Sequence, residues 1–317
     1  MRHRLRLRRA EGVFWIATRR RPAGTGKTGP ASRAGRGTVP GAILYLHRGS
    51  RTYRLYVPAS APDRPRGLVI MLHGCKQDPE DFAAGTGMNA VAETHGLAVA
   101  YPRQSGANNA SSCWNCSDPS TRCATTGDPR SLQELRWRSC RNLASIAAES
   151  SWQAYQQGAQ WRRSWARSIP IYSAAGIHSG LAYASANDVI SAFSAMRGEG
   201  GLASSPKRLA NGHRLRTIVF QGSADRTVHP SNADRIVAAA TPTGAGWTVR
   251  KESGRSPSRT YARTIVVDTA GRPAVEYWLV DGAGHAWSGG HSAGSYTDPH
   301  GPDACSQMVR FFLDEQE

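Results

Sequence analysis

Short apolar runs alternate with helix-like stretches over most of the chain, and this alternation restricts it to an α/β fold. The run LVIML at 68–72 is continuously apolar and is followed by His-Gly, as expected of a strand buried on both faces of a parallel sheet. A helix-like stretch that closes at Gly96 comes next, and then a second apolar run at 97–102. Open α/β sheets bind ligands beyond the carboxyl ends of their strands, so residues that follow a strand are the first site candidates.

The second half of the chain repeats this pattern. A strand-like run at 216–222 precedes a loop and a helix-like stretch at 232–240, and another apolar run at 274–280 precedes a glycine-rich loop. An amphipathic pattern at 303–315 predicts a final helix. The 317 residues are enough to bury one large core. We therefore expect a single α/β domain over residues 40–317, with a mostly parallel central sheet and helices on both faces.

Residues 1–39 differ in composition from the rest of the chain. They hold ten Arg and one Lys against one acidic residue, and so contribute about +10 to the net charge of +17. A basic stretch rich in Pro and Gly is typical of a disordered arm, and nucleic-acid binding is the less favoured alternative. The apolar run GVFWIA is too short for the core of a secretory signal. No run approaches the roughly 18 apolar residues of a membrane span, so we expect no membrane partner.

Candidate site residues follow three of the predicted strands. Gly74 and Cys75 come directly after the first apolar run, where one class of serine hydrolases carries a loop that gives a backbone N–H to the oxyanion hole. Asp225 and His285 follow the two strand-like runs of the second half. Each alone has a structural explanation, as a helix cap or as a packed histidine. Together they favour a catalytic acid and base, because that class places them in this order along the chain.

The chain resembles the polyhydroxybutyrate (PHB) depolymerase family of esterases. The segments that carry the resemblance are YRLYVP, LVIMLHGCKQDPEDFAAGTGMNAVAE, AYPRQSGANNASSCWN, YSAAGIHSGLAYASANDV, TIVFQGSADRTVHP, GAGHAWSGG and GSYTDPHGPDA. They fall within residues 52–115 and 172–315, about two thirds of the chain. The resemblance implies an α/β-hydrolase fold and a serine esterase that acts on poly- or oligo-(3-hydroxyalkanoate) or on another short-acyl ester.

Further expectations follow from this resemblance. It implies no metal or cofactor, and an extracellular location in which a disulfide between Cys75 and Cys113 can persist. By position, Trp114 and Trp287 are candidate substrate-binding aromatics, although burial in the core explains them about equally well.

The catalytic serine of the family is absent from the expected place. The family carries a nucleophile elbow, GLSAGG, within the stretch that corresponds to residues 116–171, and its serine is expected near Gln156. No G-x-S-x-G occurs there. Ser179 lies in G-x-x-S-G after the next strand, one residue out of register for an elbow, so we do not expect it to be the nucleophile.

The stretch 116–171 has the length that the family requires and the wrong residues, which favours a shifted reading frame. It holds four of the nine Trp residues and no clear strand pattern. When the third base of each codon is read with the first two of the next, residues 152–161 are compatible with AGLSAGGAM, which contains the elbow. The same shifted reading makes residues 116–120 compatible with FRPE and residues 168–172 compatible with HPDI. We interpret the stretch as lying between two compensating frameshifts, and expect it to be irregular and the central strand to be missing.

Two alternatives to an active esterase remain open at this point. If the frameshifts belong to the gene, the protein is a non-catalytic pseudoenzyme that keeps Asp225 and His285 without a nucleophile. The basic arm at 1–39 leaves a nucleic-acid-binding protein as the other alternative, and we regard nucleic acid as an unlikely partner.

Overall fold

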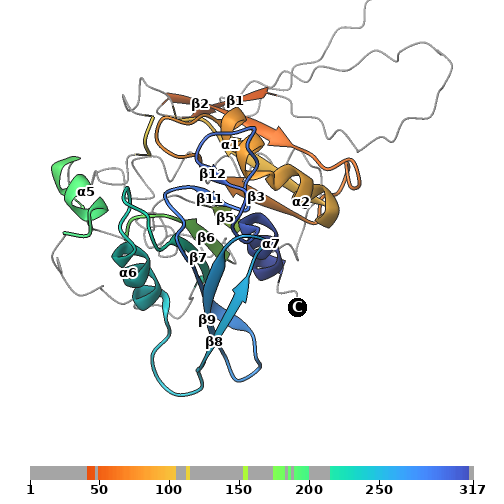
Figure 1. Cartoon of the computed structure of the whole chain (residues 1–317). Helices are drawn as coiled ribbons and strands as arrows, with labels where there is room; N and C mark the ends of the chain where they lie inside the picture. Colours follow the sequence, from red (N-terminus) through yellow and green to blue (C-terminus); the bar gives the residue numbers. More distant parts are fainter. Residues whose placement is uncertain are drawn as a thin grey trace, which may run out of the picture.

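The described part of the chain forms one large sheet with helices against both of its faces (Figure 1). The computed structural model describes residues 41–46, 49–104, 112–114, 153–155, 174–182, 185–186, 189–199 and 215–313. The predicted basic arm and all of the stretch 116–171 except 153–155 lie outside these residues.

The sheet has a parallel centre and antiparallel edges. In order across it, the strands are β1 (Gly41–Leu46), β2 (Gly49–Tyr56), β4 (Leu97–Pro102), β3 (Gly67–Met71), β5 (Gln153–Tyr155), β6 (Ala174–His178), β7 (Arg216–Gly222), β10 (Pro273–Val280), β9 (Thr260–Val267) and β8 (Thr248–Arg255). Neighbouring strands from β4 through β10 are parallel, whereas β1 and β2 at one edge and β9 and β8 at the other are antiparallel. A separate small sheet pairs β11 (Trp287–Ser288) with β12 (Thr297–Asp298). The predicted α/β fold with a mostly parallel sheet is confirmed.

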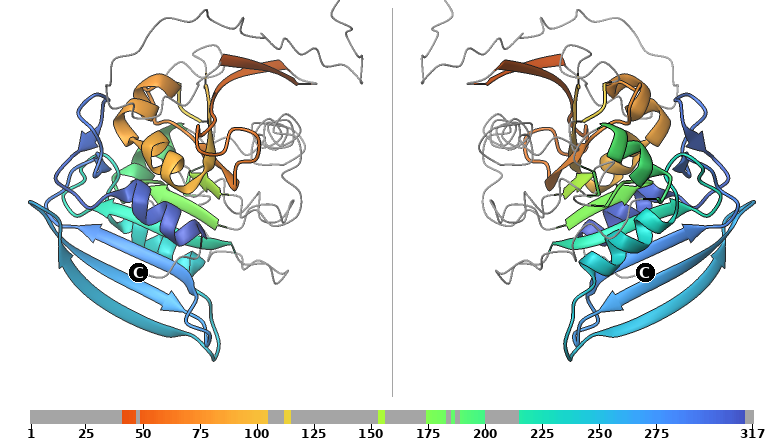
Figure 2. Two further views of the ribbon diagram at one scale, coloured as in Figure 1. Left: turned by 90° about the vertical axis from the view of Figure 1, so that its right-hand side faces the viewer. Right: turned by 90° about the vertical axis from the view of Figure 1, so that its left-hand side faces the viewer.

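Helices pack on both faces because successive side chains of a strand point in opposite directions. The helices are α1 (Pro79–Thr86), α2 (Met88–His95), α5 (Val189–Met196), α6 (Ser231–Ala240) and α7 (Ala304–Leu313). In β7, Phe220 packs in the cluster that contains Met308 of α7, whereas the adjacent Val219 packs with Ile236 of α6. The two views of Figure 2 show α7 and α6 on opposite sides of the sheet.

The helix predicted to close at Gly96 is broken into two. Gly87 adopts the left-handed region at φ 68° and ends α1, with its N–H donating to Ala83 O. A left-handed residue ends an α-helix, and glycine adopts this conformation without steric cost. The second helix then closes at Gly96, which also has a positive φ of 64°.

The expectation of a missing central strand is wrong, because a short strand occupies that place in the sheet. Residues 153–155 form β5, which pairs in parallel with β3 on one side and with β6 on the other. Without β5, the facing edges of both neighbours would keep unpaired backbone N–H and C=O groups in the middle of the sheet. The pairing uses backbone groups, so a segment without proline can occupy this place with side chains other than those of the family.

A buried ionic cluster ties the last helix to the sheet. The carboxylate Oε1 of Glu276 on β10 accepts hydrogen bonds from Arg263 Nε at 2.9 Å and from Arg310 Nη2 at 2.6 Å. The indole N–H of Trp278 donates to the same oxygen at 2.6 Å. The side chain of Glu276 has no exposed surface, so these donors replace the water that Oε1 would otherwise bind, whereas the buried Oε2 has no hydrogen-bond partner among the described residues.

We expect Glu276→Gln to lower the free energy of unfolding by about 3 kcal/mol, because it leaves two partly buried guanidinium groups without their shared carboxylate. Urea unfolding followed by circular dichroism measures this change. The matched control is Glu199→Gln at the exposed pair with Arg197, whose atoms are 3.9 Å apart, and its effect is expected to be far smaller. Equal effects from the two variants would contradict a stabilising role for the cluster.

Candidate active site

The loops after three parallel strands meet at one edge of the sheet. In the register of β10 against β7, Val280 lies opposite Gly222, so both strands end at the same level. Asp225 follows β7 and His285 follows β10, and the end of β6 brings His178 and Ser179 to the same edge. This is the carboxyl edge at which open α/β sheets bind ligands.

Asp225 and His285 are in direct contact. His285 Nδ1 lies 2.9 Å from Asp225 Oδ2. The other carboxylate oxygen of Asp225 accepts the backbone N–H groups of Thr227 and Val228 at 2.9 and 2.8 Å. Asp225 therefore caps the turn that follows it and also orients the imidazole. The side chain of His285 keeps 21% of its surface exposed, and its ring lines an open pocket.

The two loops approach closely because β7 ends in a glycine. A Cβ atom at Gly222 would lie 2.3 Å from the carbonyl oxygen of Ala283, closer than such atoms can approach. With no side chain there, Ala224 N donates to the same oxygen at 3.0 Å, and Ser223 N donates to Val280 O at 2.9 Å. These two bonds fix the loop of Asp225 against the loop of His285.

The hydrogen bonds of the loop after β3 orient the N–H groups of the two predicted oxyanion residues. Gln104 N donates to His73 Nε2 at 3.1 Å, so the neutral ring carries its proton on Nδ1, which lies 2.8 Å from Gly74 O. Gly74 N is itself bonded to Gln77 Oε1 at 3.0 Å. The C=O and N–H of a trans peptide point in opposite directions, so the N–H of Cys75 points away from His73. Of the two predicted oxyanion residues, Gly74 has its N–H engaged within the loop, whereas no hydrogen bond of Cys75 N to the other described residues is found.

Cys75 and Cys113 are joined by a disulfide, with their Cα atoms 4.3 Å apart. The bond ties the loop after β3 to the segment that follows β4. Trp114, the next residue, is 4% exposed, and its indole N–H donates to His73 O at 2.9 Å. The structure therefore does not bring Trp114 to the pocket as a substrate-binding aromatic, because its ring covers the back of the loop and its N–H is used there.

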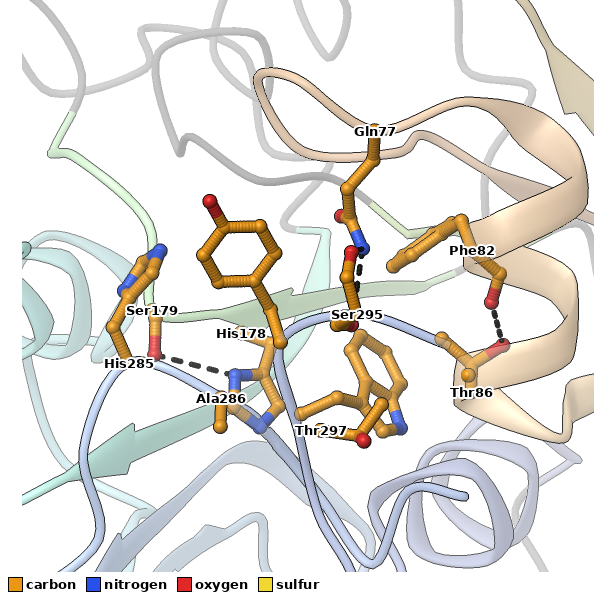
Figure 3. Close-up of a pocket in the computed structure, with 12 residues that line it drawn as sticks. Gln77, Phe82, Thr86, His178, Ser179, His285, Ala286, Ser295 and Thr297 are labelled. Atoms are coloured by element: carbon orange, nitrogen blue, oxygen red, sulfur yellow. Dashed lines mark hydrogen bonds between the residues drawn. The ribbon is translucent and has the colours of Figure 1, made fainter. Parts of the chain in front are cut away.

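A pocket opens beside His285 and extends to α1. Figure 3 shows His285 and Ser179 at one end, with Phe82 and Thr86 of α1 at the other. Trp287 also lines the pocket, although its side chain is 4% exposed. The remaining lining residues are Gln77, Gly85, His178, Ala286, Ser295, Tyr296 and Thr297. Apart from the histidines, none of the described side chains that line the pocket carries a charge at neutral pH, which suits an uncharged ligand.

His178 supports this pocket from beneath. Its Nε2 accepts the backbone N–H of Ser288 at 2.9 Å, and its ring stacks on Trp287 with the ring centres 4.8 Å apart. Burial, reinforced by the nearby His285, lowers the pKa of His178 to about 3. The ring is therefore neutral at ordinary pH and acts as a hydrogen-bond acceptor, a role that the sequence patterns did not indicate.

In the part of the chain that the structure describes, no group of three or more His, Cys, Asp or Glu side chains is arranged to hold a metal ion. Within those same residues, no helix is long and apolar enough to cross a membrane.

Asp225 links the site to the pH dependence of stability. Burial raises the pKa of its carboxyl group, but hydrogen bonds from His285 and from the backbone outweigh burial and hold the pKa below the ordinary value of 3.8. A carboxyl group with a lowered pKa stabilises the folded protein above its unfolded pKa, and this contribution disappears as the pH falls through the lower, folded value.

We therefore expect Asp225→Asn to lower the free energy of unfolding by about 2 kcal/mol at neutral pH. The difference from the unmodified protein should persist down to a pH of about 5 and shrink below about 4. Urea unfolding of both proteins across this range measures it. A difference that stays constant into acid would show that the charge of Asp225 contributes nothing.

Comparison with known proteins agrees with this geometry. Residues 51–244 match the family described as Esterase PHB depolymerase. The chain is 27% identical over 292 residues to poly(3-hydroxyalkanoate) depolymerase C of Paucimonas lemoignei, covering 88% of this chain and 65% of that protein. It is 27% identical over 201 residues to acetylxylan esterase A of Talaromyces purpureogenus, covering 56% and 50%. The chain thus spans about half to two thirds of these relatives' length.

A solved structure with the same fold is the acetyl xylan esterase from Aspergillus awamori. It superposes with a TM-score of 0.62 at 17% identity, and the match covers 87% of this chain and 99% of that one. This likeness supports the fold alone. The family match spans more than half of the chain, and so the chain belongs to the Esterase PHB depolymerase family, whose members are carboxylic ester hydrolases with the α/β-hydrolase fold.

Proposed function

We propose that this site is built for serine-type hydrolysis of carboxylic esters, with Asp225 as the acid and His285 as the base of the triad. The observation that carries the proposal is their 2.9 Å contact at the carboxyl edge of the sheet, beside an open pocket. With His285 Nδ1 bonded to the carboxylate, the other ring nitrogen is left to exchange a proton with the reacting groups.

Each step of the reaction assigns a task to these groups. A serine hydroxyl attacks the ester carbonyl while His285 takes its proton, and Asp225 stabilises the resulting imidazolium. We assign to the N–H of Cys75 a hydrogen bond to the oxygen that becomes negative, and the residue after the serine is expected to supply a second donor. His285 then protonates the departing alkoxide. Water repeats the sequence on the acyl-enzyme and releases the acid.

The chain as written lacks the group that begins this reaction. The nucleophile is expected after the central strand, and β5 ends at Tyr155, directly before Gln156 in the sequence. A glutamine amide neither ionises nor forms an acyl-enzyme. We therefore propose that this exact sequence is inactive, that two frameshifts in the segment 116–171 removed the serine, and that the frame-corrected chain is an esterase.

The substrate proposed here is a neutral ester with a short acyl group, in particular a poly- or oligo-(3-hydroxyalkanoate). The uncharged lining of the pocket supports it, and so does the relative named a poly(3-hydroxyalkanoate) depolymerase, whose match covers most of this chain. The relatives named acetylxylan esterases favour a second candidate, the acetyl esters of a polysaccharide. The disulfide between Cys75 and Cys113 supports an extracellular location, because such bonds persist in oxidising compartments.

A matched pair of proteins tests this proposal. One is the chain as written, and in the other the frame-corrected reading replaces residues 116–171. We expect hydrolysis of a short-chain p-nitrophenyl ester from the corrected protein only, because loss of the nucleophile costs on the order of 10⁶-fold in turnover. Alanine at the restored serine is the control and should abolish the activity again.

Comparable activity from the chain as written would mean that another nucleophile exists. Resequencing the gene distinguishes the two sources of the shifted frame, because an error in the sequence record vanishes on resequencing and a true pseudogene does not.

A further inference from the structure

Tyr296 has an unusual backbone conformation and an exposed ring. It adopts the left-handed region at φ 52°, which costs a residue with a side chain roughly 1–2 kcal/mol relative to glycine. The residue is 51% exposed, so its ring does not repay this cost by packing in the core. No hydrogen bond of its hydroxyl group to the other described residues is found. A glycine would meet the backbone requirement, and the aromatic side chain therefore needs a separate explanation.

The residue before Tyr296 is held by Asp81 of α1 and by Gln77, which precedes that helix. The carboxylate of Asp81 accepts Ser295 N at 2.8 Å and Ser295 Oγ at 2.5 Å. Gln77 Nε2 donates to Ser295 O at 3.2 Å and to Asp81 Oδ2 at 2.9 Å. Burial raises the pKa of Asp81, but these hydrogen bonds outweigh burial and keep the pKa low, so the carboxylate stays charged as an acceptor.

The backbone on the other side of Tyr296 is held by the loop of His285. The carbonyl oxygen of Tyr296 accepts Trp287 N at 2.6 Å, and Thr297 pairs with Trp287 in the small parallel sheet. Asp298 is bound by Arg259 Nε at 2.5 Å. The backbone conformation of Tyr296 is thus held from both sides, which fixes the direction in which its side chain leaves the backbone.

The ring of Tyr296 lies next to the proposed base. The ring centre of Tyr296 lies 6.3 Å from that of His285, with the ring planes at 75°, and both residues line the pocket. In ester hydrolysis the histidine gives its proton to the departing alkoxide. A group beside the imidazole is therefore expected to contact the alcohol portion of the ester, which is attached to that oxygen. Tyr296 therefore stands on the alcohol side of the scissile bond.

We propose that the ring of Tyr296 binds the alcohol-side repeat unit of an aliphatic polyester chain. This inference rests on the proposed function, because it uses the role of His285 to assign the side. In a poly(3-hydroxyalkanoate) the alcohol oxygen carries a branched hydrocarbon and the next ester group, which have no charge and little capacity to donate hydrogen bonds. An exposed aromatic face contacts such a unit with little loss of side-chain entropy.

Adsorption tests the proposal without requiring catalysis. The full chain as it exists is incubated with poly(3-hydroxybutyrate) particles, and the protein left in solution gives an adsorption constant. Tyr296→Gly and Tyr296→Asn remove the ring but keep residues that tolerate a positive φ. We expect each to lower the constant about five- to tenfold, and their unfolding temperatures to equal or exceed that of the unmodified protein. Tyr296→Phe should adsorb as the unmodified chain does.

The matched control is Phe193→Ala on α5, because Phe193 is 56% exposed and does not line the pocket. The adsorption constant of Phe193→Ala should equal that of the unmodified chain. Unchanged adsorption of both ring-deleted variants would overturn the proposal, as would an unmodified chain that binds acetylated xylan and not the polyester. Neither result would bear on ester hydrolysis by the frame-corrected protein, which is measured separately by turnover.

Discussion

The parallel pairing of β7 with β10 is the interaction on which the site depends. It places the ends of both strands at one level, and Gly222 leaves room for the carbonyl oxygen of Ala283 between the two loops. The contact between Asp225 and His285 follows from this register, since the residues are 60 positions apart in the chain. A shift of one residue in the pairing would turn every side chain of β10 to the other face of the sheet and separate the two.

Strand β5 separates what the fold requires from what the chemistry requires. The sheet needs a segment that satisfies the backbone groups of β3 and β6, and Gln153–Tyr155 does so. The proposed reaction needs a serine directly afterwards, and the next residue in the sequence is Gln156. Backbone pairing tolerates a change of sequence that covalent catalysis does not, so the proposed loss of the nucleophile is compatible with the family's fold.

The sequence predicted the elements whose patterns are strong and missed those stabilised by tertiary contacts. The apolar runs correspond to β3, β4, β7 and β10, which are buried in the sheet. Strand β8 escaped prediction because nearly all of its residues are exposed, and it is a strand because it pairs with β9. In the site, chain order indicated Asp225 and His285, but no pattern marks a left-handed Tyr296 or a buried, neutral His178. Both roles are defined by contacts with residues more than a hundred positions away or by backbone torsions.

Gln77 joins the two halves of the site. Its Oε1 accepts Gly74 N in the loop that presents Cys75, and its Nε2 donates to Ser295, the residue before Tyr296. Both bonds are fixed by one planar amide that is 7% exposed, so neither loop can move without breaking a bond to the other. In the proposed reaction, the first loop is assigned to the carbonyl oxygen of the ester and the second to its alcohol side. On this proposal, the amide of Gln77 links the two loops between which the ester binds.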